Sequence, residues 1–157
     1  MLPLGLIVPN GLLVEGAHLQ DLSVNLNDIR EAREVIKGVV RKTPLSFVQS
    51  EALRTRDIYL KQENFQLTGS FKIRGALNRI SRLSSSEKTK GVIAASAGNH
   101  AQGVAYSAKK FGVSSHIVMP VGAPLIKVER TKEMGSKVTL AGSYFCLLYT
   151  SPSPRDS

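Results

Sequence analysis

The chain has 157 residues, of which 42% are apolar and 21% are charged, and its single cysteine is Cys146. This composition suits one domain with a core, and it excludes intrinsic disorder, a disulfide scaffold and, because prolines and glycines interrupt the apolar stretch at 1–14, a membrane-spanning helix. The formal net charge is +9, and the excess of bases lies in residues 30–142, which contain 20 basic and 8 acidic residues. This excess is compatible with an anionic ligand, a nucleic-acid partner or an ordinary basic surface.

The N-terminal part of the chain changes character near residue 25. Residues 1–24 are expected to form an irregular extension, because glycines, prolines and asparagine interrupt the apolar residues without a stable period. Asn27 is a suitable N-cap, and the apolar residues after it recur at helical spacing, which predicts a helix over residues 28–41. This helix ends before Pro44, because the residue that precedes a proline avoids the helical region.

Short apolar runs and helical stretches alternate from residue 58 onward. An alternating pattern predicts a strand over residues 58–62, and a helix is expected over residues 70–83, followed by a serine loop at 84–86. The next expected elements are a strand at 92–95, a turn at 96–99, a helix at 100–111, a strand at 116–119, a helix at 125–134 and a strand at 137–140.

This alternation predicts the fold class, which is α/β with an open, mostly parallel sheet and helices on both faces. Ligands of such sheets bind beyond the carboxyl ends of the strands, which here means the turns at 96–99 and 120–124. Residues 143–157 are rich in serine and proline and do not continue the pattern. We expect them to be an unrelated tail after a fold that spans residues 25–142.

The segment Thr68-Gly-Ser-Phe-Lys-Ile-Arg-Gly75 places Lys72 in the first turn of a predicted helix. The partial positive charge of the helix start, the like charge of Arg74 and burial beside Phe71 would all disfavour the charged form of this amine. A neutral lysine amine can attack an aldehyde carbon. The alternative interpretation is an ordinary surface lysine, since the chain has 11 lysines.

The segment Ser96-Ala-Gly-Asn-His-Ala-Gln-Gly103 lies between an apolar strand and a helix. Its small residues allow a ligand to approach the backbone closely, and the amide groups of the turn suit a carboxylate or a phosphate. The alternative is a tight turn in which Asn99 caps the helix and His100 is solvated.

Other chemical motifs fail on their spacing. Gly98 and Gly103 are separated like the glycines of a phosphate loop, but neither the expected lysine nor a Gly-x-Gly-x-x-Gly motif is present. The three histidines are scattered, so no metal site is expected, and His116 is interpreted as a structural residue of its strand.

Together the two segments resemble the N-terminal signatures of the threonine/serine dehydratases, which are pyridoxal-phosphate enzymes of the tryptophan-synthase-β fold type, or fold type II. The resemblance covers roughly residues 25–142. It implies pyridoxal 5'-phosphate as the cofactor and a small amino acid as the substrate. Further similar segments are Lys42-Thr-Pro-Leu45, Tyr59-Leu-Lys-Gln-Glu-Asn64 and Val118-Met-Pro-Val-Gly-Ala-Pro124.

The resemblance also implies roles for individual residues. Lys72 matches the lysine that is bonded covalently to the cofactor, Phe71 the residue that packs against the cofactor ring, and Asn99 the side chain that binds the cofactor's 3-hydroxyl oxygen. The implied reaction is α,β-elimination of ammonia from L-threonine or L-serine, which yields 2-oxobutanoate or pyruvate. The residues that match the loop holding the substrate carboxylate are Ser96, Ala97, Gly98, Asn99 and His100.

The same resemblance implies that the chain is an incomplete fold type II enzyme. The family continues past residue 140 with a glycine-rich loop for the cofactor phosphate and a later group that faces the pyridine nitrogen, and neither is found in this sequence. We therefore expect the front half of a dehydratase that is inactive by itself, and a homo-oligomer when the protein is full length.

Two other functions stay open. A serine racemase, or another fold type II enzyme, would carry the same segments. A non-catalytic basic module that binds a polyanion is the remote alternative, and we expect neither nucleic acid nor a membrane as a partner. The single cysteine, and the absence of a positively charged region before the first apolar residues, favour the cytoplasm.

Overall fold

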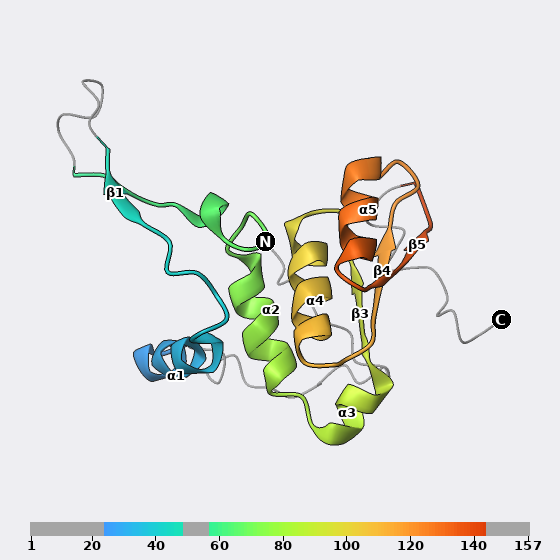
Figure 1. Ribbon diagram of the computed structural model, residues 1–157, viewed down its shortest axis with the longest axis horizontal. Helices are drawn as coiled ribbons and strands as arrows, with labels where there is room; N and C mark the ends of the chain where they lie inside the picture. Colours follow the sequence, from blue (N-terminus) through green and yellow to red (C-terminus); the bar gives the residue numbers. More distant parts are fainter. Residues whose placement is uncertain (1–23, 49–56, 144–157) are drawn as a thin grey trace.

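The computed structural model describes residues 24–48 and 57–143 (Figure 1). Most of the expected extension, 1–23, and most of the expected tail, 144–157, lie outside the described residues. The elements are α1 (Leu26–Ile36), β1 (Leu45–Phe47), β2 (Tyr59–Lys61), the 3-10 turn η3 (Glu63–Phe65), α2 (Lys72–Ser81), α3 (Ser85–Lys90), β3 (Val92–Ala95), α4 (Asn99–Lys110), β4 (Ser115–Met119), α5 (Leu125–Glu133) and β5 (Lys137–Leu140).

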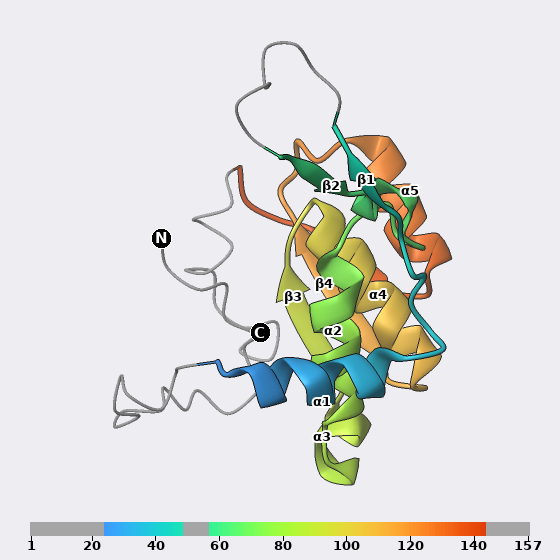
Figure 2. The ribbon, with the colours of Figure 1, turned by 90° about the vertical axis from the view of Figure 1, so that its left-hand side faces the viewer.

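The centre of the molecule is a parallel sheet with the strand order β3-β4-β5. Right-handed crossovers that advance in one direction place their helices on one side of a sheet, and α4 and α5 do cover the same face (Figure 2). The α/β class with a parallel sheet is therefore confirmed, and within the described part of the chain the helical cover is on this face.

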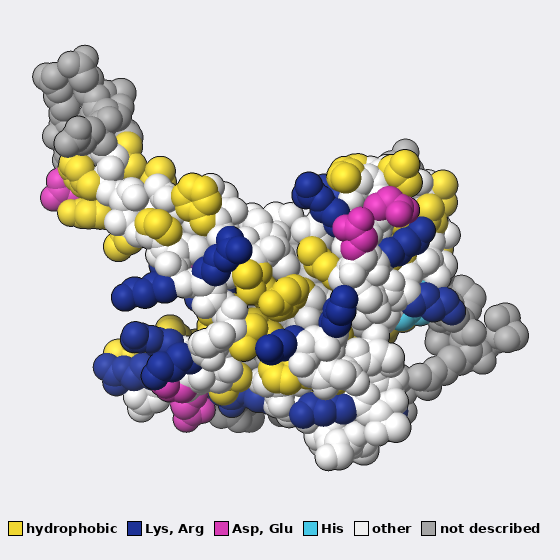
Figure 3. All heavy atoms as spheres, viewed as in Figure 1, with side chains coloured by type: hydrophobic (Ala, Val, Ile, Leu, Met, Phe, Trp, Pro, Cys, Tyr) yellow, Lys and Arg dark blue, Asp and Glu magenta, His cyan; other side chains and the backbone are white. Residues whose placement is uncertain are grey.

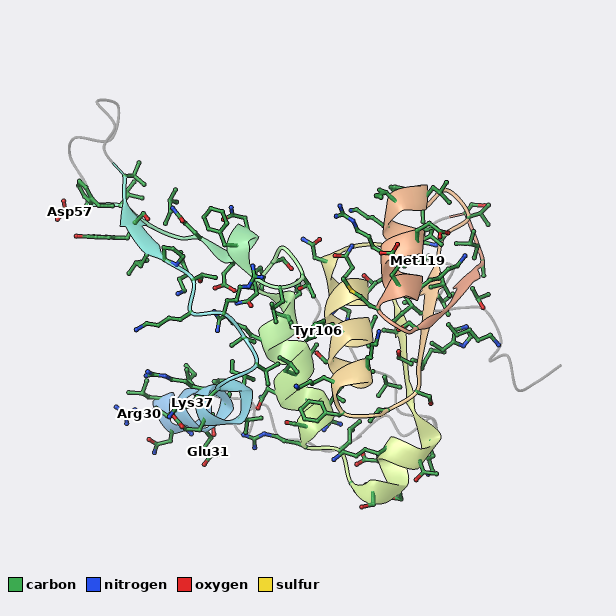
Figure 4. All side chains as sticks on the ribbon, viewed as in Figure 1. Arg30, Glu31, Lys37, Asp57, Tyr106 and Met119 are labelled. Atoms are coloured by element: carbon green, nitrogen blue, oxygen red, sulfur yellow. The ribbon has the colours of Figure 1, made fainter. Side chains whose placement is uncertain are left out.

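The hydrophobic core lies between this sheet and its helices. Ile117 and Met119 point from β4 toward α4 and α5 and are fully buried with Val104 and Val128. A second, smaller cluster joins α1 to α2, and Tyr106 of α4 packs against it. Figure 4 labels Tyr106 beside this cluster and Met119 of the main core under α5. Because α4 contributes to both clusters, it is the central helix of the molecule.

A two-stranded antiparallel arm extends from this body. Strand β1 pairs with β2, and the rings of Phe47 and Tyr59 lie opposite each other with centroids 5.4 Å apart. The arm carries exposed hydrophobic side chains along its length (Figure 3). The strand β1 was not predicted, because it has only three residues and no sequence alternation long enough to recognise.

The predicted bounds of α1 are wrong at both ends. The cap is Asn25, whose side chain accepts hydrogen bonds from the amides of Asn27 and Asp28 in a capping box, so the helix begins earlier than expected. It ends at Ile36, and Gly38 follows with a φ of +78° that no other residue type adopts readily.

The predicted serine loop at 84–86 is also wrong, because a helix begins there. Ser84 and Glu87 form a reciprocal capping box, which satisfies the first amides of α3. The other predicted elements exist with small differences in their bounds, and the strands at 92–95 and 137–140 have the expected limits.

Candidate functional site

Lys72 is the first residue of α2, so its amine projects from the start of this helix. Phe71 occupies the N-cap position and makes no side-chain capping bond, while Gly69 turns the chain into the helix with a φ of +69°. The backbone amide of Lys72 lies 3.4 Å from the hydroxyl oxygen of Ser70.

The surroundings of this amine differ from the expectation in one respect. The Lys72 Nζ atom lies 5.0 Å from the centre of the Phe71 ring, which is the range of a cation–π contact. Phe71 itself is 59% exposed and Lys72 is partly buried, so the expected burial of the amine beside Phe71 is only partial.

The sequence suggested that Arg74 adds a free positive charge beside Lys72, but the structure shows this charge paired. Its guanidinium binds the Glu63 carboxylate through two hydrogen bonds of 2.8 and 2.9 Å. This bond, more than the charge attraction, lowers the pKa of Glu63 to about 2, although burial opposes the shift. The positive charge of Arg74 is thus paired with the carboxylate of Glu63.

The second segment forms the turn between β3 and α4. Gly98, not Asn99, occupies the N-cap position, and α4 starts without a side-chain cap. The hydroxyl oxygen of Ser96 accepts a hydrogen bond of 3.3 Å from the Gly98 amide, which closes the turn. Ala97 is buried in the core. Asn99 is exposed, and its side chain does not cap the helix.

The structure brings the two segments together through the packing of α2 on α4. The helices run side by side in the same direction (Figure 1). A Cβ atom on Gly103 would lie only 3.2 Å from the carbonyl group of Lys72, so this glycine lets the first turns of the two helices touch. Burial, and next the charge of Lys72, lower the pKa of His100 in the first turn of α4.

The expected carboxyl edge of the sheet lies at the same end. The amide of Ser96 donates to the carbonyl of Val118 at 3.0 Å, so β3 and β4 finish next to each other. The turn at 120–124 follows β4 directly and leads into α5. Both turns that the sequence singled out therefore meet at one edge.

These groups fit the aldehyde- and phosphate-bearing cofactor that the resemblance implies. The site offers an amine, two helix starts without side-chain caps, and at Gly98 a position where a Cβ would meet no atom within 4 Å. The hydroxyl of Thr68, buried just before α2, has no hydrogen-bond partner among the described residues.

Other kinds of site find less support. In residues 24–48 and 57–143 no group of three or more metal-ligating side chains occurs, and no helix is long and apolar enough to cross a membrane. His116 is bound to Thr139 across the sheet, with 2.8 Å between Nε2 and the hydroxyl oxygen, which agrees with its interpretation as structural.

Three residues of the site were not recognised from the sequence. Glu63 appeared only in a similar segment and Thr68 only in the lysine segment. Gly103 appeared only as the last residue of the second segment and as a rejected phosphate-loop glycine. The spacing of Gly103 four residues after Asn99 was the available signal, because residues i and i+4 share one face of a helix.

Comparison with known proteins places the chain among pyridoxal-phosphate-dependent enzymes. A family model described as pyridoxal-phosphate dependent enzyme matches residues 36–150. The chain is 52% identical over 124 residues to the L-threonine ammonia-lyase of Thermotoga maritima. This match covers 78% of the chain and 31% of that protein. It is 49% identical over 138 residues to the catabolic L-threonine dehydratase of Staphylococcus aureus strain N315, with 87% of the chain and 39% of that protein covered.

The fold is also that of a solved relative. Maize serine racemase superimposes with a TM-score of 0.72 and 39% sequence identity, covering 77% of this chain and 37% of that one. The chain therefore spans between about a third and two fifths of the length of these relatives.

Proposed function

The chain belongs to the family of pyridoxal-phosphate-dependent enzymes, and from this premise we propose that the protein is an ammonia-lyase that acts on L-threonine and L-serine. The observation that carries the proposal is the packing of the lysine segment on α4, where a Cβ atom on Gly103 would lie 3.2 Å from the carbonyl group of Lys72. An amine that forms a covalent bond with the cofactor aldehyde must lie beside the group that holds the amino-acid substrate.

The roles of the residues follow from this arrangement. Lys72 would hold the cofactor aldehyde through a covalent bond, and its amine would accept the proton from the substrate α-carbon. The backbone amides at the start of α4 bind the substrate carboxylate together with the side chains of Ser96 and His100. Asn99 would bind the 3-hydroxyl oxygen of the cofactor, and Phe71 would pack against its ring. The bound cofactor draws electron density away from the α-carbon.

The proposed reaction removes the α-proton and the β-hydroxyl group of threonine as water. The resulting enamine takes up water and releases ammonia and 2-oxobutanoate, and serine gives pyruvate in the same way. The cytoplasm and a homo-oligomeric assembly are part of this proposal, and they rest on the sequence expectations alone.

Covalent trapping tests the assignment of Lys72. The purified protein is incubated with pyridoxal phosphate, reduced with borohydride and digested, and the modified lysine is identified by mass spectrometry. We expect the label on Lys72, its loss in Lys72→Ala, and its retention in the control Lys109→Ala, since Lys109 lies at the opposite end of α4. Labelling that spreads evenly over the surface lysines would contradict the assignment.

A serine racemase is the second candidate, and the similarity to maize serine racemase favours it. Racemisation returns the proton to the α-carbon and keeps the β-hydroxyl, whereas elimination loses both. Measuring D-serine and pyruvate from the same L-serine incubation, with the chain extended to the full length of its relatives, separates the two. We expect pyruvate as the main product, and an excess of D-serine would favour the racemase.

A further inference from the structure

A network of polar side chains lies beside the first turn of α2, and the proposed reaction does not use it. Arg74 donates from Nε to Glu63 Oε2 at 2.9 Å and from Nη2 to Glu63 Oε1 at 2.8 Å. The same Nη2 atom donates to the carbonyl oxygen of Arg41 at 3.2 Å. We call this network the Arg74 clamp, and its residues are Arg41, Thr43, Glu63, Gln66 and Arg74.

The acceptors of the clamp are themselves held in place. The hydroxyl of Thr43 donates to Glu63 Oε1. The side-chain amide of Gln66 donates from Nε2 to the Arg41 carbonyl oxygen, and its Oε1 accepts from the Arg41 backbone amide, both at 2.9 Å. Three segments that are far apart in the sequence are thereby joined at one guanidinium group.

The ion pair at the centre is largely shielded from water. The Glu63 side chain is 14% exposed and that of Arg74 is 30% exposed. A two-point bond between a planar guanidinium and a carboxylate fixes orientation as well as distance, which a single charge contact does not. The exposed pair of Glu34 and Lys37, at 64% and 73%, has no comparable constraint.

The clamp acts on the same helical turn that carries the amine. Arg74 is two residues after Lys72, and the carbonyl group of Lys72 rests on Gly103 of α4. The first turn of α2 is therefore fixed by the clamp on one side and by α4 on the other. Without Glu63, the free guanidinium would compete with Lys72 for anionic groups of the cofactor and the substrate.

We propose that Glu63 and Arg74 are positioning residues, which fix the first turn of α2 so that the Lys72 amine points at the cofactor and not at solvent. This inference rests on the proposed function, because it gives the ion pair its role in that site. The pair touches neither the cofactor nor the substrate, and it acts through Lys72.

The test measures the rate at which pyridoxal phosphate is trapped on Lys72 by borohydride, with mass spectrometry of the Lys72 peptide. We expect Glu63→Gln to slow this labelling about tenfold, because a displaced amine meets the aldehyde in a poor geometry. Arg74→Lys keeps the charge but loses the two-point bond, so it should give an intermediate rate. Because this variant is milder, it decides the question if Glu63→Gln does not fold.

Two controls separate positioning from stability. Val128→Ala weakens the core below α5 without touching the clamp, and it should label at the wild-type rate even where its thermal stability falls as far as that of Glu63→Gln. Glu34→Gln, which removes an exposed ion pair, should also label normally. Equal slowing in Val128→Ala, or wild-type labelling in both clamp variants, would overturn the inference.

The wild-type protein distinguishes the two proposals. A protein that is never labelled at Lys72 would overturn the proposed function and this inference with it. A protein that is labelled at Lys72, with clamp variants that label equally fast, would overturn the inference alone.

Discussion

At the scale of single residues, the site is organised by a few charged groups with different partners. Lys72 has no carboxylate within salt-bridge distance among the described residues, while the nearby Arg74 is bound to Glu63. The charge of Lys72 reaches His100, whose pKa is lowered first by burial and then by this amine. The two histidines described by the structure are affected in the same way, because burial and then the charge of Lys137 lower the pKa of His116.

This parallel allows a matched prediction. Replacing Lys72 by methionine removes a like charge from His100, so the pKa of His100 should rise toward its usual value while that of His116 stays unchanged. Lys137→Met should do the reverse. Titration of the histidine ring protons by NMR measures both, with His100→Gln to assign the signals. A Lys72→Met variant that moves both pKa values equally would show that the two segments do not meet as described.

At the scale of elements, two glycines inside helices serve different ends. Gly103 of α4 faces the backbone of α2, where a Cβ would lie 3.2 Å from the carbonyl group of Lys72 and from the amide nitrogen of Ile73. Gly75 of α2 faces open space, with nothing within 4 Å of its Cβ position. Glycine lowers helix stability at both positions, but only at Gly103 does the missing side chain allow the two helices to pack closely.

The two glycine-to-alanine changes should therefore have different signs. Gly75→Ala should raise the free energy of unfolding by about 0.5–1 kcal/mol, because alanine is the better helix former. In Gly103→Ala the same gain is offset by the displacement of α2, and we expect a net loss of roughly 1 kcal/mol. Urea unfolding followed by circular dichroism compares them. Equal stabilisation in both variants would mean that α2 and α4 do not pack this closely.

At the scale of the whole molecule, the Arg74 clamp joins the base of the arm to the helical body. Thr43 precedes β1 and Glu63 follows β2, so both ends of the arm meet the clamp. The pKa of Glu63 is lowered from 4.5 to about 2, chiefly by the hydrogen bond from Arg74. Because a lowered carboxyl pKa stabilises the ionised folded form, this contribution is complete above pH 4.5 and is lost as the pH falls toward 2.

Acid should accordingly destabilise the wild-type protein more than a variant without this carboxylate. Between pH 6 and pH 2.5 we expect the free energy of unfolding to fall by about 2 kcal/mol more in the wild type than in Glu63→Gln. Glu34→Gln should keep the wild-type pH dependence, because its ion pair is exposed. Urea titrations at several pH values give the slopes, and identical slopes for the wild type and Glu63→Gln would contradict the assignment.

Much of the fold could be predicted from patterns that act locally. The apolar run at 92–95 coincides with β3, since buried parallel strands need a continuous apolar sequence, and the strand expected at 137–140 coincides with β5. The errors fall where a cap decides between alternatives, as with Asn25 at α1 and Ser84 at α3. Several polar residues in each of these stretches can act as a cap, and only the backbone selects one.

The sequence by itself determined the parallel α/β class and the two segments that carry the site, because hydrophobic period and motif spacing are properties of neighbouring residues. Only the tertiary structure decided that Gly103 packs against the backbone of Lys72, and that the carboxylate of Glu63 binds the guanidinium of Arg74. These contacts join residues 11 to 31 positions apart in the chain. Their energies depend on distance and exposure, which no local pattern specifies.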